Sequence, residues 1–325
     1  MRKKVVVFSQ IDLEVLEKLK EKYDVSVINP KLGDLNEQIL KEVTHADALI
    51  GAGRLLNESN LHSATKLKVI SSVSVGYDNY DLNYLNDKNI LLCNTQHVLT
   101  ESTADLAFTL LMSAARKVPS LDRWVKNGEW TRTIGADEFG QDIHGKALGI
   151  IGLGHIGAAI ARRGFYGFNM NVLYHNRKPK PEIAHSLSAQ YCSLTELLQR
   201  SDYVVVVVDS NAESQALIGE KELNLMQKHA VIINISRGAV IDENALIQAL
   251  KNRKIFAAGL DVYQTEPLQS SELFELDNVV TLPHIGSATA STRKKMAELA
   301  YQNLVDVLDG KQPQYVVNAS LLSMK

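Results

Sequence analysis

The 325-residue sequence has few of the residues that mark disulfide-rich or metal-binding proteins. It contains only two cysteines, Cys93 and Cys192, which form no close-spaced motif, so neither a disulfide scaffold nor a cysteine-rich zinc site is expected. A single bridge between them stays open, but two buried thiols in a reducing compartment are the favoured interpretation. The nine histidines show no close pairing of the kind that holds a metal, so no metal is predicted.

Long apolar runs and a strong charge of one sign are also lacking. No apolar run reaches the length of about 18 residues that a transmembrane helix needs. The basic tip at residues 1–4 precedes only four apolar residues, which is too short for a signal peptide. Lys and Arg number 35 and Asp and Glu 37, a balance that argues against a broad basic surface for nucleic acid or membrane. We therefore expect a cytoplasmic protein with neither of these partners.

Short apolar runs alternate with amphipathic stretches along nearly the whole chain, which is typical of parallel sheets covered by helices on both faces. The length is about twice that of a usual domain, so two α/β domains with doubly wound parallel sheets are predicted. The predicted strands are Val5–Phe8, Val25–Ile28, Ala48–Ile50, Lys68–Ser71, Ile90–Cys93, Leu148–Ile151, Val172–Tyr174, Tyr203–Val208, Val231–Ile235, Ala257–Leu260 and Val279–Leu282.

Two longer helical patterns and one valine run add detail to this fold. A long helix is predicted from Thr100, with a bend near Pro119, and it is long enough to pass from one domain to the other. A last helix is predicted over Ser291–Leu308, before Gly310. Five consecutive valines, Val204–Val208, indicate a central strand buried on both faces.

A glycine-rich segment joins the predicted strand ending at Ile151 to the helix that follows. Gly152, Gly154 and Gly157 form the pattern G-x-G-x-x-G, and this strand–loop–helix context is the one that the motif requires. The first glycine permits the tight turn, the second lets a pyrophosphate approach the backbone, and the third lets helix and strand pack closely. The segment predicts a dinucleotide-binding site.

The end of the next strand indicates which dinucleotide is bound. An NAD site usually carries an acidic residue about 20 positions on, but Asn176 stands there and no acid is near. The following Arg177 and Lys178 can pair with a 2′-phosphate, which an acid would repel. This pattern favours NADP(H), with NAD(H) still possible. The alternative is a basic turn that only meets solvent.

Three chemically active side chains follow successive predicted strands downstream of the glycine loop. They are Arg237, Glu266 and His284. Ligands of open parallel sheets bind beyond the carboxyl ends of the strands, so these residues are expected to share one site. The arginine can clamp a carboxylate, the protonated histidine can donate a proton to a carbonyl oxygen, and the glutamate can orient the histidine and favour its protonated form. The set suits hydride transfer to a 2-oxo acid.

At these motifs the sequence resembles the D-isomer-specific 2-hydroxyacid dehydrogenases, over essentially its whole length. Within that family it is similar to the bacterial glyoxylate/hydroxypyruvate/2-ketogluconate reductases. The resemblance to the family rests on Val75–Asn79, Gly152–Gly157, Ile235–Gly238, Gly259–Val262, Glu266-Pro267 and Pro283–Gly286. The similarity to these reductases rests on Ser74–Asn79, Ala161–Gly164 and Tyr174–Arg177.

The resemblance implies two flavodoxin/Rossmann-like domains. Residues 1–100 and 288–325 would form a discontinuous substrate-binding domain, and residues 101–287 the NAD(P)-binding domain. Relatives form homodimers through the cofactor domains.

The resemblance also implies roles for individual residues. Arg237, Glu266 and His284 match the family's catalytic residues, of which Arg237 and His284 also bind substrate. The backbone amides of Val75 and Gly76 match the loop that holds the substrate carboxylate. The cofactor is implied to contact His155 and Ile156 over its pyrophosphate, Asp261 near its carboxamide, and Ile235 and Ser236 beside it.

Two departures from the family pattern stand beside these matches. Relatives often carry Pro-Leu-Thr after the valine strand, where this chain has Asp209-Ser210-Asn211, and this change puts the contacts on the adenine side in doubt. Relatives usually read Phe-Glu-x-Glu-Pro where this chain has Tyr263-Gln264-Thr265 before Glu266-Pro267, so only the one acid that the mechanism needs is kept.

The sequence thus predicts an NADPH-preferring reductase that converts small 2-oxo acids such as glyoxylate, hydroxypyruvate or 2-ketogluconate into D-2-hydroxy acids. One alternative is an NAD-dependent dehydrogenase of the phosphoglycerate or lactate type. The basic pair at residues 177–178 argues against it. The other is a non-catalytic dinucleotide-sensing protein on the same fold, against which the complete set of three active residues argues.

Overall fold

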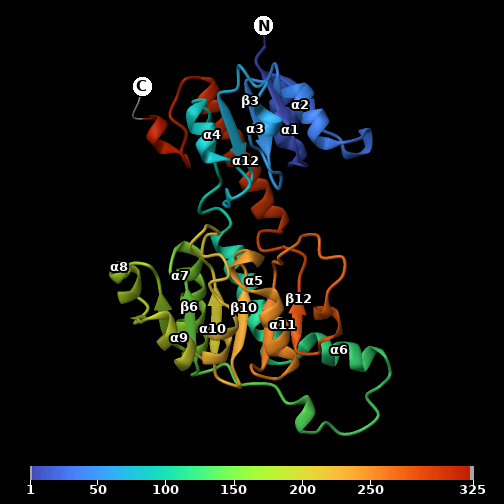
Figure 1. Ribbon diagram of the computed structural model, residues 1–325, viewed down its shortest axis with the longest axis vertical. Helices are drawn as coiled ribbons and strands as arrows, with labels where there is room; N and C mark the ends of the chain where they lie inside the picture. The colour runs from blue at the N-terminus through green and yellow to red at the C-terminus, as the bar shows by residue number, and fades with distance from the viewer. Residues whose placement is uncertain (1, 323–325) are drawn as a thin grey trace. The chain divides into compact units, whose positions relative to one another are not determined.

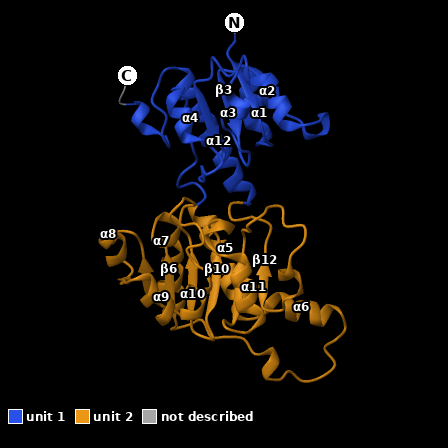
Figure 2. Ribbon diagram, in the orientation of Figure 1, with its two compact units in different colours: residues 1–99, 288–325 blue, residues 100–287 orange. Residues whose placement is uncertain are grey.

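The computed structural model describes residues 2–322 and divides the chain into two compact units, traced in Figure 1 and coloured separately in Figure 2. Unit 1 comprises residues 1–99 and 288–325, and unit 2 comprises residues 100–287. The chain therefore leaves unit 1 at the start of one helix and returns to it just before another.

Unit 1 is built on a five-stranded parallel sheet with the order β2-β1-β3-β4-β5, the flavodoxin-like order. Its strands are β1 (Lys4–Val7), β2 (Asp24–Val27), β3 (Ala48–Gly51), β4 (Val69–Ser72) and β5 (Leu91–Cys93). Its helices are α1 (Leu13–Lys22), α2 (Leu35–Val43), α3 (Glu58–Leu61), α4 (Leu82–Asp87) and α12 (Ala290–Leu308), with short 3₁₀ turns at Pro30–Leu32 and Ala319–Leu322. The side chains of Asp12, Asp34 and Asp81 cap three of these helices, which explains where they begin.

Unit 2 is built on a seven-stranded parallel sheet with the order β12-β11-β10-β9-β6-β7-β8. Its strands are β6 (Ala147–Ile151), β7 (Asn171–His175), β8 (Gln190–Tyr191), β9 (Tyr203–Val206), β10 (Val231–Asn234), β11 (Ala257–Leu260) and β12 (Val279–Thr281). The chain runs outward from β6 to β8 and then crosses back to β9, so the strand order reverses between β6 and β9. Ligands of doubly wound sheets bind at such a switch point.

Helices cover both faces of the unit 2 sheet. The helices of this unit are α5 (Thr100–Ala115), α6 (Val118–Lys126), α7 (His155–Arg162), α8 (Pro181–His185), α9 (Leu194–Arg200), α10 (Glu220–Leu225) and α11 (Glu243–Lys251), of which α6 buries no residue. One buried cluster joins α5 and α7 to the sheet, and a second joins α9, α10 and α11 to its other face. Short helical turns lie at Ala136–Glu138, Arg163–Gly167, Gly238–Val240 and Glu272–Glu275.

The predicted fold class, two doubly wound parallel α/β sheets, is confirmed, with three local differences. The valine run forms the central strand β9 but pairs only as far as Val206, because its partners end opposite that residue at Ile151 and Asn234. The two-residue edge strand β8 is too short to leave a pattern in the sequence. The expected bend near Pro119 is a complete break, in which Lys117 has a left-handed backbone (φ 54°) and Pro119 sits in the first turn of α6.

Two further expectations concern the state of the two cysteines and the presence of a membrane-spanning helix. Cys93 and Cys192 are both buried free thiols. Among residues 2–322, no helix combines the length and the apolar character needed to cross a bilayer.

Candidate active site

The glycine loop between β6 and α7 has the geometry that a dinucleotide pyrophosphate requires. Gly152 has φ +107°, and a Cβ there would lie 2.5 Å from the carbonyl oxygen of Val207. A Cβ on Gly157 would lie 2.2 Å from the Gly152 oxygen, whereas a Cβ on Gly154 would project into open space. The first and third glycines are thus required by backbone packing, and the second leaves an open approach to the loop. These residues fit the predicted ligand.

The amino end of α7 follows directly on this open glycine. Gly154 is the N-cap of the helix, and its first turn includes His155 and Ile156. Among the residues that the structure describes, no side chain caps this helix end. A helix N-terminus carries partial positive charge and donor N–H groups, so this end of α7 can hold an anionic phosphate.

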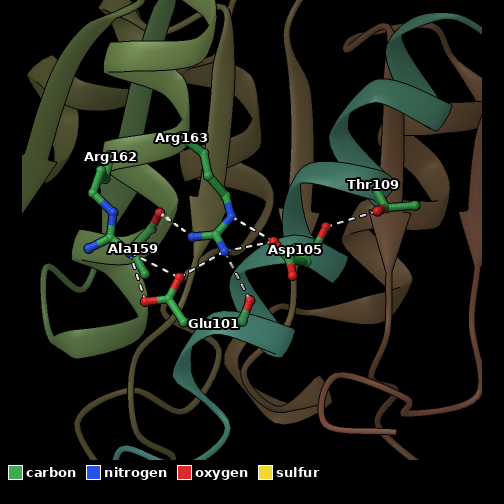
Figure 3. Close-up of polar contacts among 6 residues, drawn as sticks. All are labelled: Glu101, Asp105, Thr109, Ala159, Arg162 and Arg163. Carbon is green, nitrogen blue, oxygen red and sulfur yellow. Dashed lines mark hydrogen bonds and ion pairs between the residues drawn. The ribbon is translucent and has the colours of Figure 1, made fainter. Parts of the chain in front are cut away.

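The other end of α7 is tied to the start of α5 by a charged network (Figure 3). Arg163 donates to Asp105 at 2.6 Å, to Glu101 at 2.9 Å and to the Ala159 carbonyl at 2.8 Å, and Arg162 donates to Glu101 at 2.7 Å. Hydrogen bonds from Arg162 and then Arg163 hold the pKa of Glu101 below its ordinary value. The network fixes the helix that carries the glycine loop.

The turn after β7 holds the residues expected to distinguish NADP(H) from NAD(H). The Asn176 side-chain oxygen accepts from the Leu153 N–H at 2.6 Å, so this residue ties the turn to the glycine loop. The Arg177 guanidinium donates to the Glu213 carboxylate at 2.8 Å, and both of these side chains are well exposed. Lys178 beside them is exposed.

The turn after β10 presents Arg237. The side chain of Asn234 organises this turn, because its oxygen accepts from the Ser236 amide at 3.1 Å and its nitrogen donates to the Arg237 carbonyl at 3.0 Å. A Cβ at Gly238 would lie 1.8 Å from the carbonyl carbon of Tyr263. The glycine is therefore needed where this turn packs against the loop that leads to Glu266. Ile235 and Ser236 are buried.

His284 and Glu266 form a direct pair. The His284 Nδ1 lies 2.7 Å from one oxygen of the Glu266 carboxylate, and the Tyr263 amide donates to the other at 3.0 Å. Burial by itself raises the pKa of Glu266, but the bonds from His284 and Tyr263, with the charges of His284 and Arg237, bring that pKa below its ordinary value. The pair thus keeps an ionised carboxylate on the histidine ring.

The backbone at His284 is left-handed (φ 53°), an uncommon conformation for this residue type. Asp261 anchors the loop, because its two carboxylate oxygens accept from the amides of Ile285 at 2.7 Å and Gly286 at 2.8 Å. Burial is the main cause that raises the pKa of Asp261 above its ordinary value. The Asp261 carboxylate thus binds the backbone of the loop that carries His284.

In unit 1, the loop with Val75 and Gly76 follows β4. Its backbone is held from the end of β5, where the Asn94 side chain donates to the Val75 carbonyl at 2.9 Å and the Thr95 amide donates to the Ser74 carbonyl at 3.0 Å. Asn94 and Thr95 are both buried. The loop is therefore fixed by contacts within its own unit.

Three residues that organise these loops were not predicted from the sequence: Asn94, Asn234 and Tyr263. The two asparagines each end or follow a buried strand, where a polar residue in an apolar run is the available signal. The Tyr263 hydroxyl donates to the Leu282 carbonyl at 2.9 Å, which joins its loop to the end of β12.

A glycine loop at the switch point of a doubly wound sheet, with an arginine turn and a histidine–carboxylate pair in the same unit, defines a nicotinamide-dinucleotide oxidoreductase. The family model "D-isomer specific 2-hydroxyacid dehydrogenase, NAD binding domain" matches residues 108–286. The chain belongs to this family and is an NAD(P)-dependent oxidoreductase. The family resemblance seen in the sequence is thereby confirmed.

Known proteins align with nearly the entire chain. "Glyoxylate/hydroxypyruvate reductase B" of Enterobacter sp. (strain 638) is 43% identical, with 98% of each chain covered. The protein of the same name from Escherichia coli (strain K12) is 42% identical, again with 98% of each covered. Among solved structures, the NADPH-dependent glyoxylate/hydroxypyruvate reductase of Sinorhizobium meliloti, in complex with NADP and malonate, has a TM-score of 0.86 and 31% identity, over 98% of this chain and 97% of that one.

Proposed function

We propose that this protein is an NADPH-preferring reductase of small 2-oxo acids, which forms D-2-hydroxy acids. Glyoxylate and hydroxypyruvate are the first candidate substrates, since they appear in the names of the similar reductases. We add 2-ketogluconate as a third candidate from the sequence resemblance alone.

The observation that carries this proposal is the His284–Glu266 pair at 2.7 Å. Because Nδ1 faces the carboxylate, Nε2 is the ring nitrogen that would exchange a proton with substrate. In reduction, His284 donates that proton to the carbonyl oxygen, and Glu266 stabilises the positive ring before transfer. When bound, the reduced dinucleotide would supply the hydride to the carbonyl carbon, and the product would be the 2-hydroxy acid.

Arg237 is proposed to bind the carboxylate of the substrate. A guanidinium offers paired donors that match a carboxylate, and its charge would also polarise the neighbouring carbonyl. The backbone amides of Val75 and Gly76 are proposed as further substrate-binding groups. Unit 1 would thus be the substrate-binding domain and unit 2 the cofactor-binding domain.

The preference for NADPH is proposed from the turn after β7. Asn176 replaces the acid that would accept a ribose hydroxyl, and the exposed Arg177 and Lys178 can pair with a 2′-phosphate. The similar Sinorhizobium meliloti enzyme is described as NADPH-dependent and was solved with NADP. Along the rest of the dinucleotide, we propose contacts from residues of the glycine loop and the strand ends, namely His155, Ile156, Ile235, Ser236 and Asp261.

A homodimer is proposed as the assembled form. Large apolar side chains are exposed along residues 118–139, and exposed apolar patches often mark protein–protein contact sites. They are Val118, Val125, Trp130, Ile134 and Phe139. Light scattering on the purified protein should give twice the chain mass, and Trp130→Glu should shift it toward one chain mass. A monomer at all concentrations would contradict this part of the proposal.

The whole proposal is tested by following loss of the reduced nicotinamide with purified protein, NADPH or NADH, and a panel of 2-oxo acids. We expect turnover with glyoxylate and hydroxypyruvate, a higher kcat/KM with NADPH, and D-glycerate from hydroxypyruvate. No turnover with any 2-oxo acid would refute the reductase. A higher kcat/KM with NADH would refute the cofactor preference alone.

A further inference from the structure

The Arg177–Glu213 pair stands in the proposed 2′-phosphate site. Arg177 would have to face the phosphate of NADPH, yet its guanidinium already donates to a carboxylate at 2.8 Å. The two side chains are 79% and 71% exposed, so water screens this bond and either partner can be replaced.

The loop that carries Glu213 has a defined backbone. It follows β9 and includes the segment Asp209–Asn211. The Asn211 side-chain oxygen accepts from the Glu213 backbone N–H at 2.9 Å, and the Asn211 backbone N–H donates to the Ser214 hydroxyl at 2.9 Å. That hydroxyl donates in turn to the Asp209 carbonyl at 2.7 Å, and Ser214 is buried. These bonds order the backbone around Glu213, and its side chain reaches Arg177 in the turn after β7.

We propose that Glu213 is a specificity-determining residue that competes with the 2′-phosphate of NADPH for Arg177 and so weakens the discrimination against NADH. This inference rests on the proposed site for the 2′-phosphate. A 2′-hydroxyl leaves the ion pair intact, whereas a 2′-phosphate must displace the carboxylate or share the guanidinium with it. The phosphate carries about −1.5 to −2 charges near neutral pH, so the nearby carboxylate also repels it.

The test uses two fragments that differ only in this phosphate: adenosine 2′,5′-bisphosphate and adenosine 5′-monophosphate. Their dissociation constants are measured by calorimetry for the unaltered protein and for Glu213→Gln, which keeps the side-chain shape. We expect the variant to bind the bisphosphate about threefold to tenfold more tightly and the monophosphate unchanged. The gain should shrink as salt is added, because both groups are exposed.

Glu275→Gln is the matched control. Glu275 is an exposed glutamate in the turn before β12, which lies at the opposite edge of the sheet from β7 and β8, and the same charge is removed there. It should leave both dissociation constants unchanged. In the Arg177→Ala background, the gain from Glu213→Gln should fall to less than half, because the contested partner is absent.

The binding data separate this inference from the proposed function. Bisphosphate affinity that is unchanged or lower in Glu213→Gln would overturn the competition, and a loss would mean that Glu213 instead holds Arg177 ready for the phosphate. If the unaltered protein binds both fragments equally, the NADPH preference is refuted. If the Glu213→Gln variant then favours the bisphosphate, the competition is still supported. The ratio of kcat/KM for NADPH over NADH should rise in step with the bisphosphate affinity.

Discussion

Two charged pairs in unit 2 differ in how firmly they are held. The His284 and Glu266 side chains are 46% and 33% exposed, the carboxylate also accepts from the Tyr263 backbone, and Asp261 anchors the loop after the histidine. The Arg177–Glu213 pair is one bond between two exposed side chains. The first arrangement holds the geometry that the proposed proton transfer would use, and the second can be rearranged at little cost. We infer that substitutions at the His284–Glu266 pair impair the proposed proton transfer, whereas substitutions at the Arg177–Glu213 pair alter the proposed preference between NADPH and NADH.

The largest expected effect comes from breaking the firmly held pair. His284→Ala should lower kcat by at least about 100-fold, since a positioned general acid contributes that much or more. Dinucleotide affinity, measured by fluorescence titration, should stay within about twofold because the glycine loop is intact. His229→Ala is the control. This histidine precedes β10, at the opposite end of that strand from Arg237, and it pairs with Asp202. Turnover retained in His284→Ala would contradict the proposed role of the acid.

A smaller and selective effect is expected at the exposed pair. Arg177→Ala should lower kcat/KM with NADPH by about tenfold, because one exposed charge-assisted contact to the phosphate is lost. The value with NADH should change by less than about twofold. Arg253→Ala serves as the control, because it removes an exposed arginine that pairs with Asp277. Equal losses with the two cofactors would show that Arg177 does not read the phosphate.

The lowered pKa of Glu266 leads to a prediction about pH and stability. A carboxyl whose pKa is lower in the folded state stabilises the fold above its unfolded value near 4.5, and this contribution is lost as pH falls through the folded value. Glu266→Gln mimics the protonated form. The Tm of the variant should therefore lie below that of the unaltered protein at neutral pH, and the gap should close as the pH falls below 4.5. A gap that widens in acid would reverse the sign of the proposed interaction.

The smallest effect is expected in the network behind the glycine loop. Arg163→Met should lower the free energy of unfolding by about 1 kcal/mol, because its half-buried guanidinium joins Glu101 and Asp105 to α7. Arg162→Met is the comparison, and it should cost less because that side chain is more exposed and pairs with Glu101 alone. Chemical denaturation would measure both. A larger loss for Arg162→Met would show that the burial of Arg163 is not what matters.

The fold could be predicted almost completely because its pattern is local. Buried parallel strands appear as apolar runs such as Val204–Val206, and the glycine loop is a contiguous motif between strand and helix. The two-residue strand β8 could not be predicted, since it has no periodicity and exists only through its pairing with β7.

For the candidate site, the sequence predicts residue types at strand ends but not the contacts between them. Arg237, Glu266 and His284 each follow a strand, and parallel strands bring their carboxyl ends to one edge of a sheet. The bond between Arg177 and Glu213 joins residues 36 positions apart through a loop that departs from the family pattern. Similarly, the sequence does not signal the hydrogen bond between Asp261 and the histidine loop or the left-handed backbone at His284 in that loop.

The central claim is that His284 delivers the proton while the bound dinucleotide delivers the hydride to a 2-oxo acid. The most direct test is a single-turnover experiment in which NADPH bound to excess enzyme is mixed with hydroxypyruvate and its absorbance is followed. We predict rapid loss of NADPH with D-glycerate as product, and a rate at least about 100-fold slower in His284→Ala at the same NADPH occupancy. Equal rates in the two proteins, or no loss of NADPH in either, would contradict the account.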